Sequence, residues 1–236
     1  MRVVAFGVAI LLAGCSLDPF TGDSEALDRF SRAYTEFLDN VETPYDLMSY
    51  VGEDNDPAGY WTLFTSAFDL SLTDSGRLVA AESAIATYDK FMPKTLDAAA
   101  DEVEKLDKEV QRLFETANAI HNQDYRDTAV QVAKYAREAQ TSVASMQALV
   151  DRRTRLQRQT LSDVVSVNGS LVRVLNTPTM RARADETIKI NRELQDPART
   201  SPALQNLKDT FSALKGKTNL KVYPTEDELA EQKKGR

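Results

Sequence analysis

TLDAAADEVEKLDKEVQRLFETANAI, residues 95–120, carries an unbroken apolar stripe. Apolar side chains recur through it at alternating spacings of three and four residues, which places them on one face of a helix. The stripe consists of Leu96, Ala99, Val103, Leu106, Val110, Leu113, Ala117 and Ile120. A repeat sustained over so many turns favours a long helix that packs lengthwise against its neighbours at a shallow angle.

The same periodicity appears upstream, where loops and a proline separate the striped segments. We expect a first helix over residues 24–41 and a loop over residues 43–59, which are rich in glycine, proline and acidic side chains. A short, well-buried helix is predicted over residues 60–72, and another over residues 78–92. Pro93 is predicted to kink or end that helix, because proline lacks the N–H that the helix interior needs.

Downstream, a stripe of the same kind fills residues 125–150, but polar side chains then interrupt it. Arg153, Gln157 and Thr160 stand where the pattern calls for apolar residues, before valines and leucine resume it. Because the spacing is kept across the interruption, we expect one continuous helix over residues 125–175.

Asn168-Gly169, flanked by valines, offers an alternative to that long helix. This dipeptide is typical of a tight hairpin turn between two strands. We favour the helix, because an isolated hairpin is only marginally stable. Two further helices are predicted, one over residues 177–195 and one over residues 201–214.

These segments predict an all-α fold, an antiparallel bundle of long helices. Residues 24–224 are expected to form the bundle as one domain. Residues 225–236 are expected to form a charged C-terminal tail, which begins with a capping box but has no apolar face.

Charge is distributed unevenly along the chain. Residues 15–120 hold 8 Lys and Arg against 22 Asp and Glu, a net charge of −14, whereas residues 121–236 hold 20 against 14, a net charge of +6. We expect acidic helices of the first half to pack beside basic helices of the second. The alternative is a basic face for an anionic partner. Nucleic acid is not an expected partner, because the chain is acidic overall and aromatic residues do not interleave its basic ones.

The N-terminus has the organisation of a secretory signal. Arg2 supplies one positive charge, and residues 3–13 form an apolar run that is too short to span a bilayer as a helix. The run ends in Leu12-Ala13-Gly14-Cys15, which contains the only cysteine of the chain. Small residues directly before a cysteine resemble the lipobox of bacterial lipoproteins. A truncated membrane anchor or a buried free cysteine is the alternative.

The lipobox resemblance implies a location and an anchor. In that class the signal peptide, here residues 1–14, is removed and the cysteine, here Cys15, receives diacylglycerol and often a further acyl chain. Two or more chains hold a protein stably on a membrane. Residues 15–23 would then form a tether. Ser16 resembles the residue found after the cysteine in lipoproteins sent to the Gram-negative outer membrane. The face of that membrane, periplasmic or external, stays open.

A second resemblance concerns the body of the protein. Residues 122–127, Asn-Gln-Asp-Tyr-Arg-Asp, lie between two long predicted helices, and Tyr34 lies close to Asn40 in the first helix. This arrangement resembles helical bacterial lipoproteins of unknown function, over residues 25–175. The resemblance implies the same fold and envelope location, but no activity.

The sequence offers no catalytic or metal-binding set. His121 is the only histidine, and its position at a helix end predicts a structural role rather than a catalytic one. No nucleotide-binding, nucleophile-elbow or metal-ligand motif occurs. We therefore expect no enzyme activity, no cofactor and no metal.

Arg152, Arg153, Arg155 and Arg158 form the one cluster with a suggested role. Three interpretations are open: the stripe drifts to neighbouring leucines, the cluster is a patch for an anionic lipid or an envelope protein, or one arginine is buried. In the last case we predict that Arg152 or Arg153 pairs with Glu102, Glu104 or Glu109.

The function expected from the sequence is an interaction or scaffold module anchored to the envelope membrane through Cys15. The alternative is a carrier of an apolar ligand or lipid in the bundle core. A filled core would favour the scaffold, and a wide apolar cavity would favour the carrier.

Overall fold

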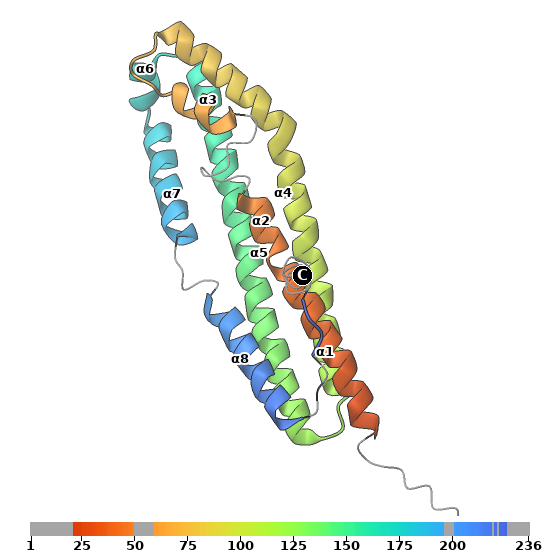
Figure 1. Cartoon of the computed structure of the whole chain (residues 1–236). Coiled ribbons are helices and arrows are strands. Elements are labelled where there is room, and N and C mark those ends of the chain that lie inside the picture. The colour runs from red at the N-terminus through yellow and green to blue at the C-terminus, as the bar shows by residue number, and fades with distance from the viewer. Residues whose placement is uncertain (1–20, 50–58, 196–200, 219, 221, 226–236) are drawn as a thin grey trace, which may run out of the picture.

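A computed structural model describes residues 21–49, 59–195, 201–218, 220 and 222–225. Within these residues the chain forms α-helices and no strand, so the predicted all-α fold is confirmed. Two helices of more than forty residues, α4 (Asp74–Asn118) and α5 (Gln123–Ser166), run antiparallel along the whole body. At 1.5 Å per residue each is about 65 Å long. Figure 1 shows the shorter helices packed along this pair.

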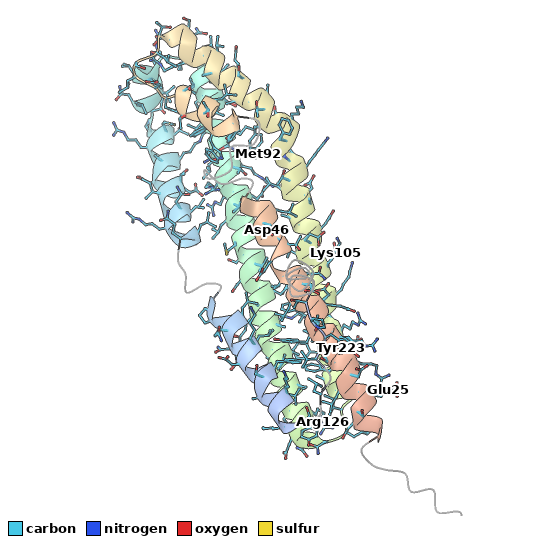
Figure 2. All side chains as sticks on the ribbon, in the orientation of Figure 1. Glu25, Asp46, Met92, Lys105, Arg126 and Tyr223 are labelled. Carbon is cyan, nitrogen blue, oxygen red and sulfur yellow. The ribbon has the colours of Figure 1, made fainter. Side chains whose placement is uncertain are left out.

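The apolar stripe quoted above forms the contact between the two long helices. Leu106, Val110 and Leu113 of α4 are fully buried, as are alanines and valines of α5 between residues 129 and 143. Small alanine side chains let the two helices approach closely. Met92 and Lys105, both labelled in Figure 2, lie on opposite faces of α4. Met92 is buried, whereas the Lys105 side chain is 60% exposed.

Two ion pairs connect α4 and α5. Arg137 pairs with Asp107, and further along Arg158 pairs with Asp89 through two hydrogen bonds of 2.6 and 2.9 Å. In both pairs the acidic residue belongs to the first half of the chain and the arginine to the second. The expected packing of acidic against basic helices is therefore present in the structure.

Helices α1 (Thr21–Val41) and α8 (Ser201–Lys217) cover one half of the long pair. They meet through aromatic rings: Tyr34 of α1 stacks on Phe211 of α8 with centroids 3.6 Å apart and planes 3° from parallel. The chain after α8 returns to α1. There Tyr223 donates to Asp28, and Thr35 donates to the Tyr223 carbonyl oxygen over 3.3 Å.

The N-terminal half differs from expectation at three places. Helix α1 begins at Thr21, three residues earlier than expected, so residues 21–23 of the predicted tether are helical. The predicted loop over 43–59 is wrong in its first part, because Thr43–Ser49 forms α2; residues 50–58 lie outside the described residues. Helix α3 covers only Tyr60–Ser66, and Leu70, expected within it, is 83% exposed.

Pro93 lies inside α4 and does not end it. The two stripes that were expected to form separate helices over residues 78–92 and 96–120 are therefore parts of one helix. Figure 1 shows that α4 changes direction partway along its length. The long contact with α5 supports the helix on both sides of the proline, because burial of the stripe outweighs the loss of one backbone hydrogen bond.

Neither prediction for residues 164–175 is right. Helix α5 ends at Ser166, and a short helix α6 (Leu171–Leu175) follows after a turn in which Asn168 and Gly169 have φ of 54° and 76°. The dipeptide thus makes a positive-φ turn, as its residue types suggest, but it joins helices and not strands. The last two helices, α7 (Pro178–Leu194) and α8, confirm the prediction within three residues at each end.

No helix among the described residues has both the length and the apolar character needed to cross a membrane.

Candidate functional site

The predicted lipidation residue, Cys15, lies outside the described residues, as do the signal peptide and most of the charged tail. The structure does place the end of the body to which Cys15 connects. Asp23, in the first turn of α1, accepts a hydrogen bond from the backbone N–H of His121 over 2.6 Å and one from that of Asn122 over 3.1 Å. The start of α1 is therefore held against the α4–α5 connection.

His121 follows α4 and its side chain is 81% exposed, with Nδ1 3.5 Å from an Asp23 oxygen. The N-cap of α5 is Asn122, whose side chain accepts a hydrogen bond from the Tyr125 N–H over 3.2 Å. His121 and Asn122 therefore take part in attaching α1 to the rest of the bundle.

Two residues of the family resemblance also have defined partners. Tyr34 stacks on Phe211, and the Asn40 amide donates to Glu109 over 2.7 Å. Both contacts join α1 to other helices of the bundle.

The four clustered arginines point in different directions. Arg152 pairs with Glu186 of α7, and Nη1 of Arg153 donates to the Asn191 side chain of the same helix over 3.5 Å. Arg155 pairs with an aspartate one turn away on α5, and Arg158 pairs with an aspartate on α4. The cluster therefore does not present one uniform basic face.

The predicted pairing of Arg152 or Arg153 with Glu102, Glu104 or Glu109 is wrong. The two ion pairs between α4 and α5 place this part of α4 opposite residues 137–143 of α5, about 20 Å before Arg152. The acidic partner of Arg152 comes from α7. The sequence could not show this, because the apolar stripes of two long helices leave their relative alignment open.

A groove of about 640 Å³ opens beside these arginines, between α3, α5 and α7. Its walls are mainly apolar. They include Trp61, Phe64 and Phe68 from α3 and the turn after it, with Met180 and Ile188 from α7. Trp61 is the only tryptophan of the chain and is 6% exposed. The volume is typical of sites that take a small organic molecule.

Polar residues of α5 and α7 also line the groove, and most of them are engaged. The Thr160 hydroxyl donates to the Leu156 carbonyl over 2.8 Å, and Arg183 pairs with Asp163. Gln157 differs from these. It is 7% exposed, and its Oε1 atom has no hydrogen-bond partner among the described residues.

A second buried polar atom lies close to this region. The Tyr60 hydroxyl has no hydrogen-bond partner among the described residues. Burial, and then the neighbouring Tyr88, raises the pKa of Tyr60 above its ordinary value, so the phenol stays protonated. The Gln157 oxygen and the Tyr60 hydroxyl thus leave two buried polar atoms without a partner in this region of the described structure.

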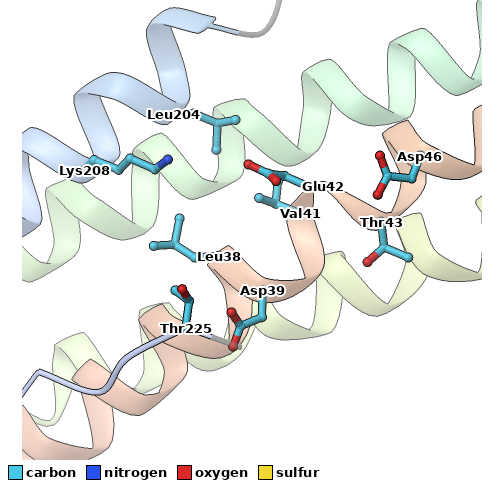
Figure 3. Close-up of a pocket in the computed structure, with 9 residues that line it drawn as sticks. All are labelled: Leu38, Asp39, Val41, Glu42, Thr43, Asp46, Leu204, Lys208 and Thr225. Atoms are coloured by element: carbon cyan, nitrogen blue, oxygen red, sulfur yellow. The ribbon is translucent and has the colours of Figure 1, made fainter. Parts of the chain in front are cut away.

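Another depression, of about 300 Å³, lies near the junction of α1, α2 and α8 (Figure 3). Its lining is polar, with Asp39, Glu42 and Asp46 on one side and Lys208 of α8 approaching from the other. No group of three or more His, Cys, Asp or Glu side chains able to hold a metal ion occurs in the part of the chain that the structure describes. The groove beside α3 is therefore the stronger candidate for a site.

Comparisons with models of known protein families, with curated proteins and with solved structures find no match for this chain.

Proposed function

We propose that this protein is an interaction module of the bacterial envelope, anchored in the membrane by lipid on Cys15 and without catalytic activity. The sequence Leu12-Ala13-Gly14-Cys15 after a short apolar run supports the anchor, and Ser16 supports delivery to the outer membrane. The fully buried apolar side chains between α4 and α5 support a structural rather than a transporting role for most of the body.

The observation that carries the interaction role is an apolar tip at the end of the bundle farthest from the anchor. The tip consists of the exposed side chains Leu70, Leu72, Val79, Val172 and Leu175. They belong to the turn before α4, the start of α4, and α6. These segments meet there, since Gly169, just before α6, lies against Asp74 and Leu78. Single exposed apolar residues are ordinary, but a group of them at one end marks a contact surface.

The geometry fits a module that reaches away from a membrane. The anchor leads into α1, whose start is held against the α4–α5 connection, and the apolar tip lies at the opposite ends of α4 and α5. The separation is about 65 Å. Because the tip is apolar and the four clustered arginines face partners within the molecule, an envelope protein suits this surface better than an anionic lipid.

Site-specific crosslinking in intact cells tests this function. A photoreactive amino acid replaces Val172 at the tip, and a matched control replaces Lys108, which is 72% exposed on the side of α4. We expect a discrete crosslinked product from position 172 and none from position 108. Equal products from both positions, or none from position 172, would contradict the proposal.

The groove beside α3 favours a second candidate function, the binding of an apolar ligand. Its volume and aromatic lining meet the needs of such a ligand. The ligand would lie in this groove at the side of the bundle, and not between the long helices, where the apolar side chains of the stripes are fully buried.

A further inference from the structure

The groove beside α3 contains a polar group that its own walls do not satisfy. Gln157 is more than nine-tenths buried, lines the groove, and holds an Oε1 atom without a hydrogen-bond partner among the residues described. A buried amide oxygen left without a donor destabilises the folded chain, so a position of this kind calls for an explanation.

The surroundings of Gln157 limit which chemical groups can be its hydrogen-bond partner. An amide oxygen can only accept, so the partner has to be a donor, an O–H or an N–H. The nearby Thr160 hydroxyl already donates to its own helix, and Arg183 is engaged by Asp163. The hydroxyls of Thr65 and Thr187, which also line the groove, likewise donate within their own helices. The Gln157 oxygen is itself fully covered, so a donor from outside the chain would enter the groove and meet it after a rotation of the Gln157 side chain.

The other residues that line the groove indicate the chemistry of the rest of the ligand. Trp61, Phe64 and Phe68 supply aromatic faces, and Met180 and Ile188 supply flexible or branched aliphatic surface. Arg183 is the one charged residue among the described residues that line the groove, and it is already paired with Asp163, so a charged ligand would find no unpaired counter-ion there. The lining suits a neutral apolar body.

We propose that the groove between α3, α5 and α7 binds a neutral, apolar small molecule that carries one hydroxyl or N–H group, and that the Oε1 atom of Gln157 receives this donor. The inference rests on the second candidate function, apolar ligand binding, and adds to it the chemical class of the ligand and the residue that selects it.

Trp61 provides a direct reporter of this site, because it is the only tryptophan of the chain and lines the groove. The full chain, held in lipid nanodiscs, is titrated with N-phenyl-1-naphthylamine, an apolar fluorophore with one N–H. Bound dye accepts excitation from Trp61 only at short range. Dye dissolved in the bilayer lies near the anchored end. Tyr60, next to Trp61, packs against Tyr88, which lies 30 residues before the end of α4. Trp61 is therefore about 45 Å from the anchored end, and this dye contributes little.

Displacement of the dye by a matched pair of competitors then tests whether a hydrogen-bond donor on the ligand is needed. 1-Decanol and methyl nonyl ether have the same number of heavy atoms, but only the alcohol can donate. We expect the preference for decanol over the ether to be about 2–10-fold greater in the wild type than in Gln157→Met, the range expected for one hydrogen bond. Comparison of the two proteins cancels the unequal partition of the competitors into lipid.

Two control pairs keep the result specific. Gln140 is also buried on α5 but lies away from the groove, so Gln140→Met should keep the wild-type preference. Ala184 lines the groove on α7 and Ala182 does not, so Ala184→Phe should abolish transfer from Trp61 while Ala182→Phe leaves it unchanged. Melting curves verify that each variant is folded.

The outcomes distinguish two claims: that the groove binds a ligand, and that Gln157 accepts the hydrogen bond from it. If dye binds and Ala184→Phe blocks it, but Gln157→Met keeps the preference for decanol, the groove binds ligands and the assignment of the donor to Gln157 is overturned. If the wild type shows no transfer from Trp61 at any dye concentration, ligand binding itself fails. Energy transfer from Trp61 to the dye that persists in Ala184→Phe also overturns the proposed site.

Discussion

Asn168 and Gly169 both have positive φ where α5 ends, and Gly169 is also confined by a neighbouring segment. A Cβ atom at Gly169 would lie 1.9 Å from the Asp74 carbonyl oxygen at the start of α4. Arg77 reinforces the contact, because its Nε donates to the Gly169 carbonyl over 3.0 Å and the side chain is buried. The turn after α5 is thus fixed by backbone contact with α4 as well as by local preference.

Gly169→Ala should therefore destabilise the protein strongly. We expect a loss of about 3 kcal/mol or more in the free energy of unfolding, because the methyl group meets backbone that cannot move independently. This corresponds to a fall in melting temperature of roughly 6–12 °C for a chain of this size. Gly216→Ala in α8 is the control, since no atom lies within 4 Å of its Cβ position. Equal melting temperatures for the two variants would refute this explanation.

Glu109 is the residue whose charge state should depend most on the fold. Burial is the main cause that raises its pKa to about 7 from 4.5, and the neighbouring carboxylates of Glu36 and Glu102 add to it, against a smaller opposing effect of the hydrogen bond from Asn40. Between these two pH values the folded chain holds a proton that the unfolded chain has released. Stability contributed by this group is therefore present below about pH 4.5 and is lost as the pH rises through 7.

Glu109→Gln removes this dependence and keeps an oxygen for Asn40. We expect the variant to match the wild type near pH 5 and to exceed it at pH 8 by roughly 1–2 kcal/mol, a value reduced for partial exposure of the side chain. Thermal melts across this pH range measure the difference. Glu104→Gln, on the exposed face of the same helix, should show no such trend. A constant difference between Glu109→Gln and wild type at all pH values would contradict the prediction.

At the scale of elements, the long helices were predictable because their apolar stripes repeat over many turns and become buried as expected. The short elements were not. Helix α2 is only seven residues long and includes a proline near its start, so it gives no periodic signal. The end of α5 depends on contact between Gly169 and α4, which is remote in sequence. Of the two effects predicted for Pro93, the end of the helix is wrong, because tertiary packing supports a helix that local preference disfavours.

The alignment of α4 with α5 should depend more on the apolar stripe than on the ion pairs that join the helices. Asp89 and Arg158 are each 39–49% exposed, so Asp89→Asn should cost no more than about 1 kcal/mol. Leu106→Ala, at a fully buried position of the stripe, should cost about 2–5 kcal/mol. Denaturant unfolding of both variants measures these values. A larger loss for Asp89→Asn than for Leu106→Ala would show that the ion pair dominates.

For the whole molecule, the sequence indicated the candidate site only in part. Gln157 and Thr160 were visible as polar interruptions of the α5 stripe, and both line the groove. Their meaning could not be known from the sequence, because the apolar walls come from α3 and α7, about 100 residues before and 20–30 residues after them. The arginine cluster was visible for the same reason, but its partners on α7 were not. A polar residue that interrupts an apolar stripe indicates an unusual environment, but the sequence does not show which residues of other helices surround it.

The elongated shape of the molecule explains why the proposed lipid anchor matters for function. A bundle about 65 Å long, if attached at one end through Cys15 as proposed, would hold both the apolar tip and the groove away from the membrane surface. If Cys15 were not lipidated, neither surface would have a fixed position in the envelope. The anchor is therefore the assumption on which the proposed function most depends.

Mass spectrometry of the protein extracted from membranes tests that assumption most directly. After digestion with trypsin, we predict that the N-terminal peptide runs from Cys15 to Arg29 and carries the mass of two or three acyl chains. In Cys15→Ser this acylated peptide should be absent. The contradictory result is a wild-type peptide that continues unbroken through Gly14 and Cys15, with an unmodified cysteine.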